Sequence, residues 1–297
     1  MSAARLDPPT IEGVRRRFVN ARGIDFHVTE AGPEDGVPVL CLHGWPQHHY
    51  EFRDLLAEPP AGLRIIAVDL PGYGWSGPPP HRWEKDEVAS DVLALLDTLG
   101  LRQVVLAAHD WGGFVGYLMA VRAPERMSAF LPLNIAHRWN PVSVLLPHMW
   151  RFWYQPVIGF FGVPIQQYTP FVAFGLWNHL YDKRTMTWDE IRVYSDRFRD
   201  PVCAQAGSDT YRTFVTKEIP AMRRTPETRR LHVPTRALFG IYDRAIHTSL
   251  VSPRHVDADD YRVELVPDCG HFIVDEQPAL VRARVAALAA EFPPASA

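Results

Sequence analysis

The sequence predicts an α/β fold built on a mostly parallel, doubly wound sheet with an inserted helical cap. Short apolar runs alternate with segments whose apolar residues recur at helical spacing, which is typical of parallel strands covered by helices on both faces. The alternation stops between residues 137 and 220, where Trp, Phe, Tyr and Pro are frequent and helical hairpins are expected. We therefore predict a core domain at residues 1–136 and 221–297. Residues 137–220 are predicted to form a cap domain over the carboxyl ends of the strands, where doubly wound folds bind ligands.

The core begins with two expected strands, at residues 17–20 and 23–30, that flank a short turn. Compact apolar runs that end in loops then predict strands buried on both faces, because such strands show little alternation of polar and apolar residues. These strands are expected at residues 37–42, 63–68, 103–108, 129–133, 235–239 and 262–266. Helices are expected at residues 85–99, 111–122 and 278–291, and Gly100 is a natural C-terminal cap for the first of them.

The composition is ordinary for a soluble globular protein, with 47% hydrophobic and 22% charged residues. The formal net charge of −3 predicts neither nucleic-acid binding nor attraction to anionic membranes. The three cysteines, Cys41, Cys203 and Cys269, are odd in number and widely spaced, which favours a reducing compartment over a disulfide framework. The N-terminus has no run typical of a signal peptide. We expect a cytoplasmic monomer or homodimer.

The most apolar segment, residues 142–165, is interrupted by Pro147, Pro156 and Pro164 and contains Arg151. A membrane-spanning helix needs about 20 mostly uninterrupted apolar residues, so no membrane span is expected here. The segment is predicted instead to be buried or to line an apolar cavity.

The segment Leu106-Ala-Ala-His-Asp110-Trp-Gly-Gly113 lies between a predicted strand and a predicted helix. It has the small-X-nucleophile-X-small pattern of a nucleophile elbow, with Asp in the nucleophile position. A lone Asp at a strand end is more often a helix N-cap. The small residues on both sides favour a nucleophile, since they permit a sharp turn and close packing of the helix on the strand.

Aspartate in this position restricts the chemistry. A carboxylate that attacks a saturated carbon displaces a leaving group and becomes an ester of the enzyme. Water must then attack the carbonyl carbon of that ester, so an oxyanion hole is still required. Epoxides and alkyl halides are the natural electrophiles for this scheme.

A histidine and a second carboxylate follow the elbow in sequence. His271 lies after the last predicted strand, from where a base could reach Asp110. Asp243, just past another strand, is expected to orient its ring. Asp268 is closer to His271 along the chain but is predicted to be a turn residue. The order nucleophile, acid, histidine supports the choice of His271 among 13 histidines.

The early segment His43-Gly-Trp-Pro46 follows a buried strand. The backbone N–H groups of Trp45 and Trp111 are predicted to form the oxyanion hole, and Pro46 is expected to fix the loop. His43 itself is predicted to anchor the loop through a hydrogen bond. No cluster of His, Asp or Glu with metal-ligand spacing is visible, and neither a metal nor a cofactor is expected.

Together these motifs resemble the epoxide hydrolase branch of the α/β-hydrolase superfamily. The resemblance covers about residues 18–292 and rests on four segments: His-Gly-Trp-Pro-Gln47, Asp-Leu-Pro-Gly-Tyr-Gly-Trp-Ser76, His-Asp-Trp-Gly-Gly113 and Gly-His-Phe272. It implies an α/β-hydrolase fold with a cap. It also implies two cap tyrosines that hydrogen-bond the epoxide oxygen.

By this resemblance the two tyrosines are Tyr154, followed by Gln, and Tyr211, followed by Arg. A phenol with a pKa of about 10 can protonate the much more basic alkoxide that epoxide opening produces. Pro46, Trp153 and Phe272 are further candidates to line the substrate pocket. The remaining alternatives to the two tyrosines are Tyr168, Tyr181 and Tyr194.

The predicted activity is hydrolysis of an apolar epoxide, with water as the second substrate, to a vicinal diol. The aromatic cap and the pair Phe160-Phe161 suggest a bulky substrate. Haloalkane dehalogenases are an alternative because they share the Asp–His chemistry, although they typically have Asn at the position of Trp45 and lack the tyrosine pair. Fluoroacetate dehalogenases resemble this chain in the Tyr-Arg segment and in the pair Trp153-Tyr154. Their elbow, however, carries arginines that hold the substrate carboxylate, and Trp111 and Phe114 occupy those places, which disfavours a small anionic substrate. A non-catalytic binding protein is a third alternative, but such proteins usually lose a triad member.

Overall fold

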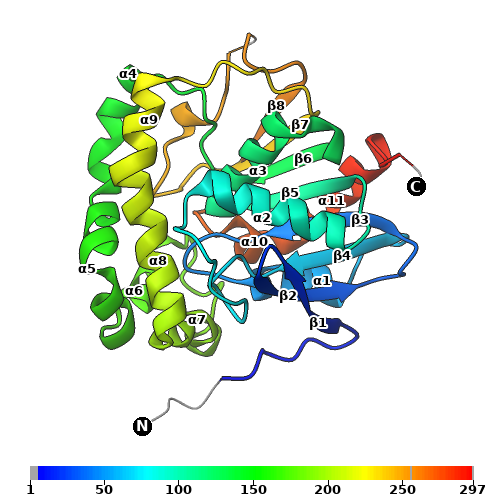
Figure 1. The fold of residues 1–297 in the computed structure, drawn as a ribbon, viewed down its shortest axis with the longest axis horizontal. Coiled ribbons are helices and arrows are strands. Elements are labelled where there is room, and N and C mark those ends of the chain that lie inside the picture. Colours follow the sequence, from blue (N-terminus) through cyan, green and yellow to red (C-terminus); the bar gives the residue numbers. More distant parts are fainter. Residues whose placement is uncertain (1–5, 255, 296–297) are drawn as a thin grey trace.

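The computed structural model describes residues 6–254 and 256–295, within which eight strands form one sheet in the order β1-β2-β4-β3-β5-β6-β7-β8 (Figure 1). β1 pairs antiparallel with β2 and β2 with β4, whereas all other neighbouring strands are parallel. The strands are β1 (Arg15–Ala21), β2 (Ile24–Ala31), β3 (Val37–Leu42), β4 (Leu63–Val68), β5 (Val104–His109), β6 (Met127–Leu133), β7 (Thr235–Gly240) and β8 (Tyr261–Val266).

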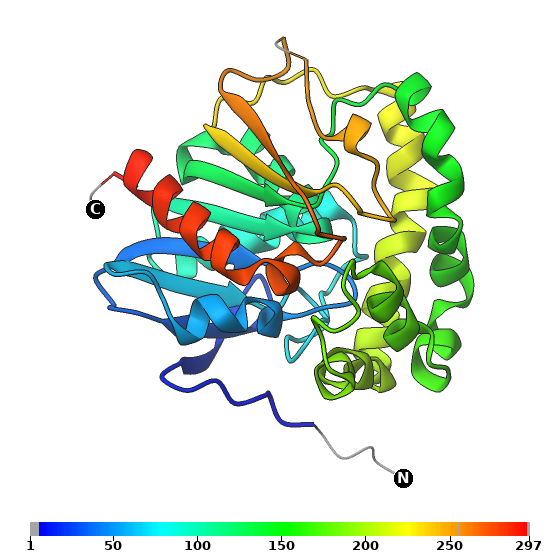
Figure 2. The same cartoon turned by 180° about the vertical axis from the view of Figure 1, so that it is seen from behind.

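This arrangement confirms the predicted fold class. β3 and β4 begin and end at the predicted residues, and β3, β4 and β5 are central strands whose apolar runs are covered on both faces. One face of the sheet is covered by α2 (Lys85–Thr98) and α3 (Asp110–Arg122). The other is covered by α1 (Arg53–Ala57) and α11 (Pro278–Glu291) (Figures 1 and 2). Each layer of helices encloses its own apolar core against the sheet.

Between β6 and β7 every residue is described, and the segment consists of helices and loops apart from one bridging residue, Leu231. Figures 1 and 2 show these helices gathered at one side of the core, where the arrowheads of the central strands point. The helices are α4 (Val142–Leu145), η3 (Leu146–Phe152), α5 (Tyr154–Tyr168), α6 (Phe171–His179), α7 (Trp188–Ser195), η4 (Asp196–Arg199), α8 (Pro201–Thr213), the π-helical turn η5 (Phe214–Glu218) and α9 (Ile219–Arg224).

The longest of these helices, α5, packs along α8 through a narrow stripe of small and polar residues. The stripe consists of Gln155, Ile158, Gly159, Gly162 and Gln166. A methyl group on Gly159 would lie 3.1 Å from the backbone nitrogen of Arg212, so the two helices approach closely.

The expectation that residues 142–165 are buried or line a cavity is wrong for most of their large side chains. Leu146, Met149, Trp150, Trp153, Phe160 and Phe161 are all exposed. The physical reason is that one face of α5 already meets α8, and α5 cannot bury both of its faces in a single layer of helices. No single described helix is long and apolar enough to cross a membrane. One pair, Ser143–Tyr168 with Phe171–His179, reaches that length and composition but bends by 103° between its parts.

Candidate active site

Asp110 begins α3 directly after β5, with no intervening loop and with a φ angle of +44°. A positive φ is uncommon for a residue other than glycine and indicates backbone strain. Two glycines make room for this turn. A methyl group on Gly44 would lie 2.4 Å from Cβ of Asp110, and one on Gly112 would lie 2.5 Å from the carbonyl oxygen of His43. The turn therefore has the geometry of the predicted elbow, with small neighbours required by contact.

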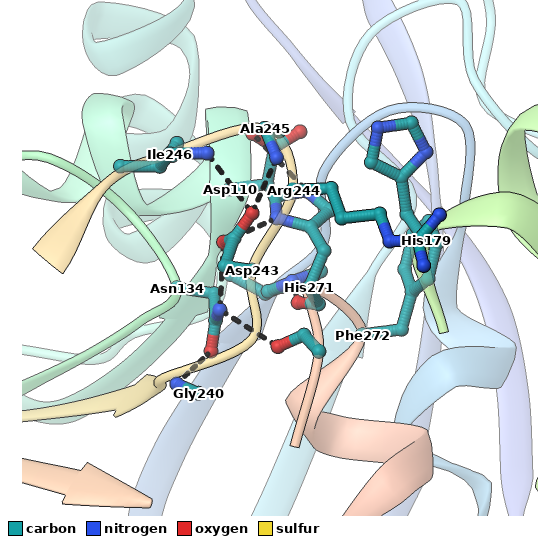
Figure 3. Close-up of polar contacts among 12 residues, drawn as sticks. Asp110, Asn134, His179, Gly240, Asp243, Arg244, Ala245, Ile246, His271 and Phe272 are labelled. Carbon is teal, nitrogen blue, oxygen red and sulfur yellow. Dashed lines mark hydrogen bonds and ion pairs between the residues drawn. The ribbon is translucent and has the colours of Figure 1, made fainter. Parts of the chain in front are cut away.

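His271 lies between Asp110 and Asp243 (Figure 3). Its Nδ1 is 2.8 Å from Oδ2 of Asp243, a hydrogen bond, and its Nε2 is 3.8 Å from Oδ1 of Asp110. The three residues follow β5, β7 and β8, whose carboxyl ends lie at one edge of the sheet. Asp268, the rival of Asp243, adopts a φ of +50° in the turn after β8 and makes no hydrogen bond to His271 among the described residues. The structure thus brings together the three side chains singled out from the sequence.

Asp243 is held by several donors, as Figure 3 shows. Its Oδ1 accepts the N–H groups of Ala245 and Ile246 at 2.7 and 2.9 Å, and its Oδ2 accepts the side-chain amide of Asn134 at 2.8 Å. Burial alone would raise the pKa of Asp243, but His271 and these donors outweigh burial and lower it. An ionised Asp243 fixes the proton of His271 on Nδ1 and leaves Nε2 facing Asp110.

The pKa values of Asp110 and His271 are both raised, in contrast to that of Asp243. Burial raises the pKa of Asp110, and His271, His109 and the amides of Trp111 and Trp45 only partly oppose this increase. Burial would lower the pKa of His271, but the carboxylates of Asp243 and Asp110 outweigh burial and raise it.

Both amides predicted for the oxyanion hole face the carboxylate of Asp110. The backbone N–H of Trp45 donates to Oδ2 of Asp110 at 3.1 Å, and the amide of Trp111 also stabilises the ionised form. The peptide bond from Trp45 to Pro46 is cis, and Pro46 is buried. His43 accepts the N–H of Leu70 at 2.9 Å through Nε2 and so anchors the loop in the predicted way.

The two cap tyrosines lie beside each other and next to the tryptophans of the oxyanion loops. The ring centroids of Tyr154 and Tyr211 are 5.7 Å apart. Tyr211 contacts the rings of Trp45 and Trp111 at 5.5 and 5.4 Å, and Tyr154 stacks on Trp45 at 6.4 Å. Burial, with the nearby charge of Asp110, raises the pKa of both phenols. Both therefore remain protonated hydrogen-bond donors.

The remaining predicted residues differ in whether they are buried at the candidate site. Trp153 is 63% exposed, so the prediction that it lines the pocket is wrong. Trp153 and Tyr154 are adjacent in the sequence and therefore point in different directions around the helix axis, and the side chain of Trp153 points outward. Phe160 and Phe161 are exposed as well, so they give no support to the expectation of a bulky substrate. Phe272 is buried between His109 and His271. Of the alternative tyrosines, Tyr168 and Tyr181 are exposed, and Tyr194 hydrogen-bonds Asp275.

The sequence interpretation missed a buried pair behind the nucleophile. His109 contacts the carboxylate of Glu51 through Nδ1 at 3.2 Å and the backbone carbonyl of His271 through Nε2 at 2.9 Å. Both partners accept hydrogen bonds, so Nε2 of His109 carries a proton and a second proton is shared between Nδ1 and Glu51. His109 stands within the elbow motif, but no local signal connects it with Glu51, which is 58 residues away.

Lys85 was also missed. Its side chain is fully buried, with Nζ 4.6 Å from the ring centroid of Trp111 and 3.2 Å from the carboxylate of Glu218. Nζ also donates to the carbonyl of Thr210, the residue before Tyr211. Lys85 thus connects the core to α8 beside the candidate site. A charged residue at the first position of a helix usually lies in solvent, which is why sequence patterns do not identify it.

One group of possible ligand atoms is formed by residues too far apart in the sequence for any spacing pattern to indicate it. His27, His49 and Asp69 come together in the core, with their potential ligand atoms within 4.8 Å of one another. The two Nδ1 atoms each lie 2.9 Å from an oxygen of Asp69, which also accepts the N–H groups of His49 and Trp75. These four donors satisfy the carboxylate, so the cluster is explained as an anchor for the loops after β3 and β4.

The sheet order and the strained elbow after β5 define an α/β-hydrolase fold, and Asp110, His271 and Asp243 meet at the carboxyl edge of its sheet. The family model described as alpha/beta hydrolase fold matches residues 37–162. AB hydrolase superfamily protein YfhM of Bacillus subtilis (strain 168) is 28% identical over 283 residues, covering 91% of this chain and 96% of that protein. Epoxide hydrolase 4 of Mus musculus is 26% identical over 275 residues, covering 87% of this chain and 74% of that protein.

Among solved structures, wild-type Cfl2 from Burkholderia cenocepacia is similar with a TM-score of 0.81 at 23% identity, covering 96% of this chain and 98% of that chain. At that identity the likeness bears on the fold alone. The protein thus has the α/β-hydrolase fold, and its relatives include proteins named epoxide hydrolases. These findings confirm the resemblance that its motifs indicate.

Gly112→Ala tests the close approach at the elbow. The new methyl group would overlap the backbone of Leu42 and His43, which cannot move without distorting β3. We expect the free energy of unfolding to fall by about 1–3 kcal/mol, measured by urea denaturation. Gly175→Ala in α6 is the matched control, because its methyl group would meet only a ring carbon of Trp45 at 3.9 Å. An equal loss in both variants would contradict the packing argument.

Proposed function

We propose that the protein hydrolyses an apolar epoxide to a vicinal diol through a covalent ester on Asp110. The observation that carries the proposal is a carboxylate at the elbow combined with two adjacent phenols, Tyr154 and Tyr211, on the cap. The epoxide hydrolase names among the relatives support the same reaction.

In the first step, an oxygen of Asp110 attacks an epoxide carbon and the ring carbon–oxygen bond breaks. The electrons of that bond move to the epoxide oxygen, which hydrogen-bonds both phenols and takes a proton from one of them. The product is a hydroxyalkyl ester of Asp110. Because both phenols keep their protons at neutral pH, this acid is available when the ring opens.

In the second step, His271 takes a proton from water and the resulting hydroxide attacks the ester carbon of Asp110. The oxyanion that forms is stabilised by the amides of Trp45 and Trp111, which already face this carboxylate. Collapse breaks the ester bond, and the departing alkoxide takes the proton from His271. The proton left on the carboxyl group of Asp110 restores the phenol, so that epoxide and water give the diol without net proton change.

Dehalogenation of an alkyl halide is a second candidate, favoured by one observation. Nε1 of Trp111 is buried beside the phenol of Tyr211 and makes no well-formed hydrogen bond among the described residues, so a halide bound there can accept its hydrogen bond. The phenol pair favours the epoxide, because a departing halide needs no proton whereas an alkoxide does.

The His271→Gln variant tests the two-step scheme. Without the base the ester should persist, so incubation with styrene oxide should add the mass of one epoxide in intact-protein mass spectrometry. Asp110→Ala should show neither the adduct nor diol formation. Parallel incubation with 1,2-dibromoethane separates the two candidates. Halide release without diol formation from any epoxide would favour the dehalogenase, and a His271→Gln variant without an adduct from either compound would refute the ester.

Replacing the phenols tests their assignment as the acid. Tyr154→Phe together with Tyr211→Phe should lower kcat for epoxide opening by about 10²-fold or more, since proton transfer contributes roughly that factor. Tyr168→Phe is the control, because this tyrosine is 80% exposed on the outer side of the cap. Undiminished turnover in the double variant would remove both tyrosines from the mechanism.

The pH dependence tests the pairing of His271 with Asp243. His271 must be neutral to accept a proton from water, and its pKa is raised, so ester hydrolysis should be lost as the pH falls through that raised pKa. Asp243→Asn removes the largest favourable cause, and the acidic limb of the single-turnover rate should move to lower pH while the plateau falls. Asp268→Asn should leave the profile unchanged. A shift in the Asp268 variant alone would reverse the assignment.

A further inference from the structure

Except for Tyr154, the aromatic residues of α5 lie on its outer side. Exposed apolar residues recur every three or four positions and so share one face of the helix: Trp153, Pro156, Phe160, Phe161, Pro164 and Tyr168. Phe160 and Phe161 are 53% and 65% exposed. The opposite face, against α8, contains two glycines and two glutamines. This is the reverse of an ordinary surface helix, whose apolar face points to the core.

The exposed apolar residues continue beyond α5. Leu146, Met149 and Trp150 are exposed on η3, directly before it, and Phe174 is exposed on α6, directly after it. From residue 139 to residue 181 the sequence contains no Asp or Glu, and Arg151 is its single Lys or Arg. We call the exposed apolar residues of η3, α5 and α6 the outer cap face. Figures 1 and 2 show α5 along the outer edge of the molecule, away from the sheet. Large exposed apolar surfaces of this kind mark interaction sites.

The charge of the chain is divided unequally between its parts. Residues 137–224 carry 11 Lys and Arg against 7 Asp and Glu, a formal charge of +4, so the rest of the chain carries −7. The net charge of −3 conceals this difference, and the sequence-based expectation of no attraction to anionic membranes rested on that average. Two copies of this part of the chain, residues 137–224, would therefore repel each other, whereas an anionic surface would attract it.

A groove of about 700 Å³ adjoins the outer cap face at the end of α5. Tyr168 belongs to both, and Trp188, Arg192 and Arg199 also line the groove. Arg192 and Arg199 are exposed, and each pairs with an aspartate on its own helical turn, Asp189 and Asp196. Exposed ion pairs of this kind are weak, so an anion of higher charge density can replace the aspartate. Aromatic side chains beside arginines are typical of the boundary between lipid chains and headgroups.

We propose that the outer cap face docks on an anionic lipid surface. Phe160, Phe161 and Trp153 enter the region where headgroups meet acyl chains, and Arg192 and Arg199 contact lipid phosphates at the groove. The protein lies on the surface of the membrane, since no single described helix is long and apolar enough to cross it. The proposal is independent of the reaction at Asp110.

Vesicle flotation with the full chain tests the proposal. The wild type should float with vesicles of phosphatidylcholine and phosphatidylglycerol, bind more weakly to phosphatidylcholine alone, and dissociate as salt is raised. Phe160→Ser with Phe161→Ser should lower the partition coefficient by about tenfold or more. Arg192→Gln with Arg199→Gln should weaken binding and reduce its salt dependence. Phe18→Ser is the matched control, because Phe18 is 57% exposed on β1, outside the cap.

Docking of the unmodified chain can also be measured by the quenching of tryptophan fluorescence by brominated lipids, with Trp150 and Trp153 as the tryptophans expected to contact the lipid. Circular dichroism and light scattering check each variant for folding and for mass in solution. Three outcomes would overturn the proposal: no flotation and no quenching for the wild type, equal loss in Phe18→Ser, or a wild-type dimer that the double phenylalanine variant dissociates. The last outcome would identify a second copy of the chain as the occupant of the outer cap face.

Discussion

The left-handed backbone of Asp110 is the constraint on which the rest of the candidate site depends. A positive φ at a residue other than glycine costs about 1–3 kcal/mol and persists only where the surroundings impose it. Here β5 is a central strand between β3 and β6, and α3 begins without a linker, so the chain cannot relax by lengthening the turn. Because Gly44 and Gly112 have no side chains, the turn can pass within contact distance of the end of β3. The same approach brings the amide of Trp45 to the carboxylate of Asp110.

The charges around this turn depend on one another. Asp243 is fixed by Asn134 and two backbone amides, and His271 takes its orientation and its raised pKa from Asp243. Behind Asp110, His109 joins the carboxylate of Glu51 to the backbone carbonyl of His271. Because these groups are buried, removing one of them would leave the charge of its partner buried and unpaired. This cost explains why each of them is hydrogen-bonded to another group nearby.

The parts of the structure that were predictable are those whose signal is local. The central strands are apolar runs because both of their faces are covered. The elbow could be predicted because its small residues surround Asp110 in the sequence. Contacts that close over long separations could not be predicted: Glu51 meets His109 across 58 residues, and Lys85 meets Thr210 across 125. The face of an apolar helix was also out of reach. The sequence of a helix with aromatic residues on one side and glycines on the other shows that it has two different faces. Which of the two faces is buried depends on the element that packs against the helix. The exposed Trp153 and Phe160 illustrate this limit.

The two faces of α5 follow from a single packing choice. Gly159 and Gly162 let α8 approach so closely that Tyr154 and Tyr211, one on each helix, come within 5.7 Å of each other. Larger residues on that face would separate the helices and move the phenols apart. Once glycine and glutamine occupy the face against α8, Phe160, Phe161 and Tyr168 stand on the outer face. The proposed acid and the outer cap face are therefore both consequences of the contact between α5 and α8.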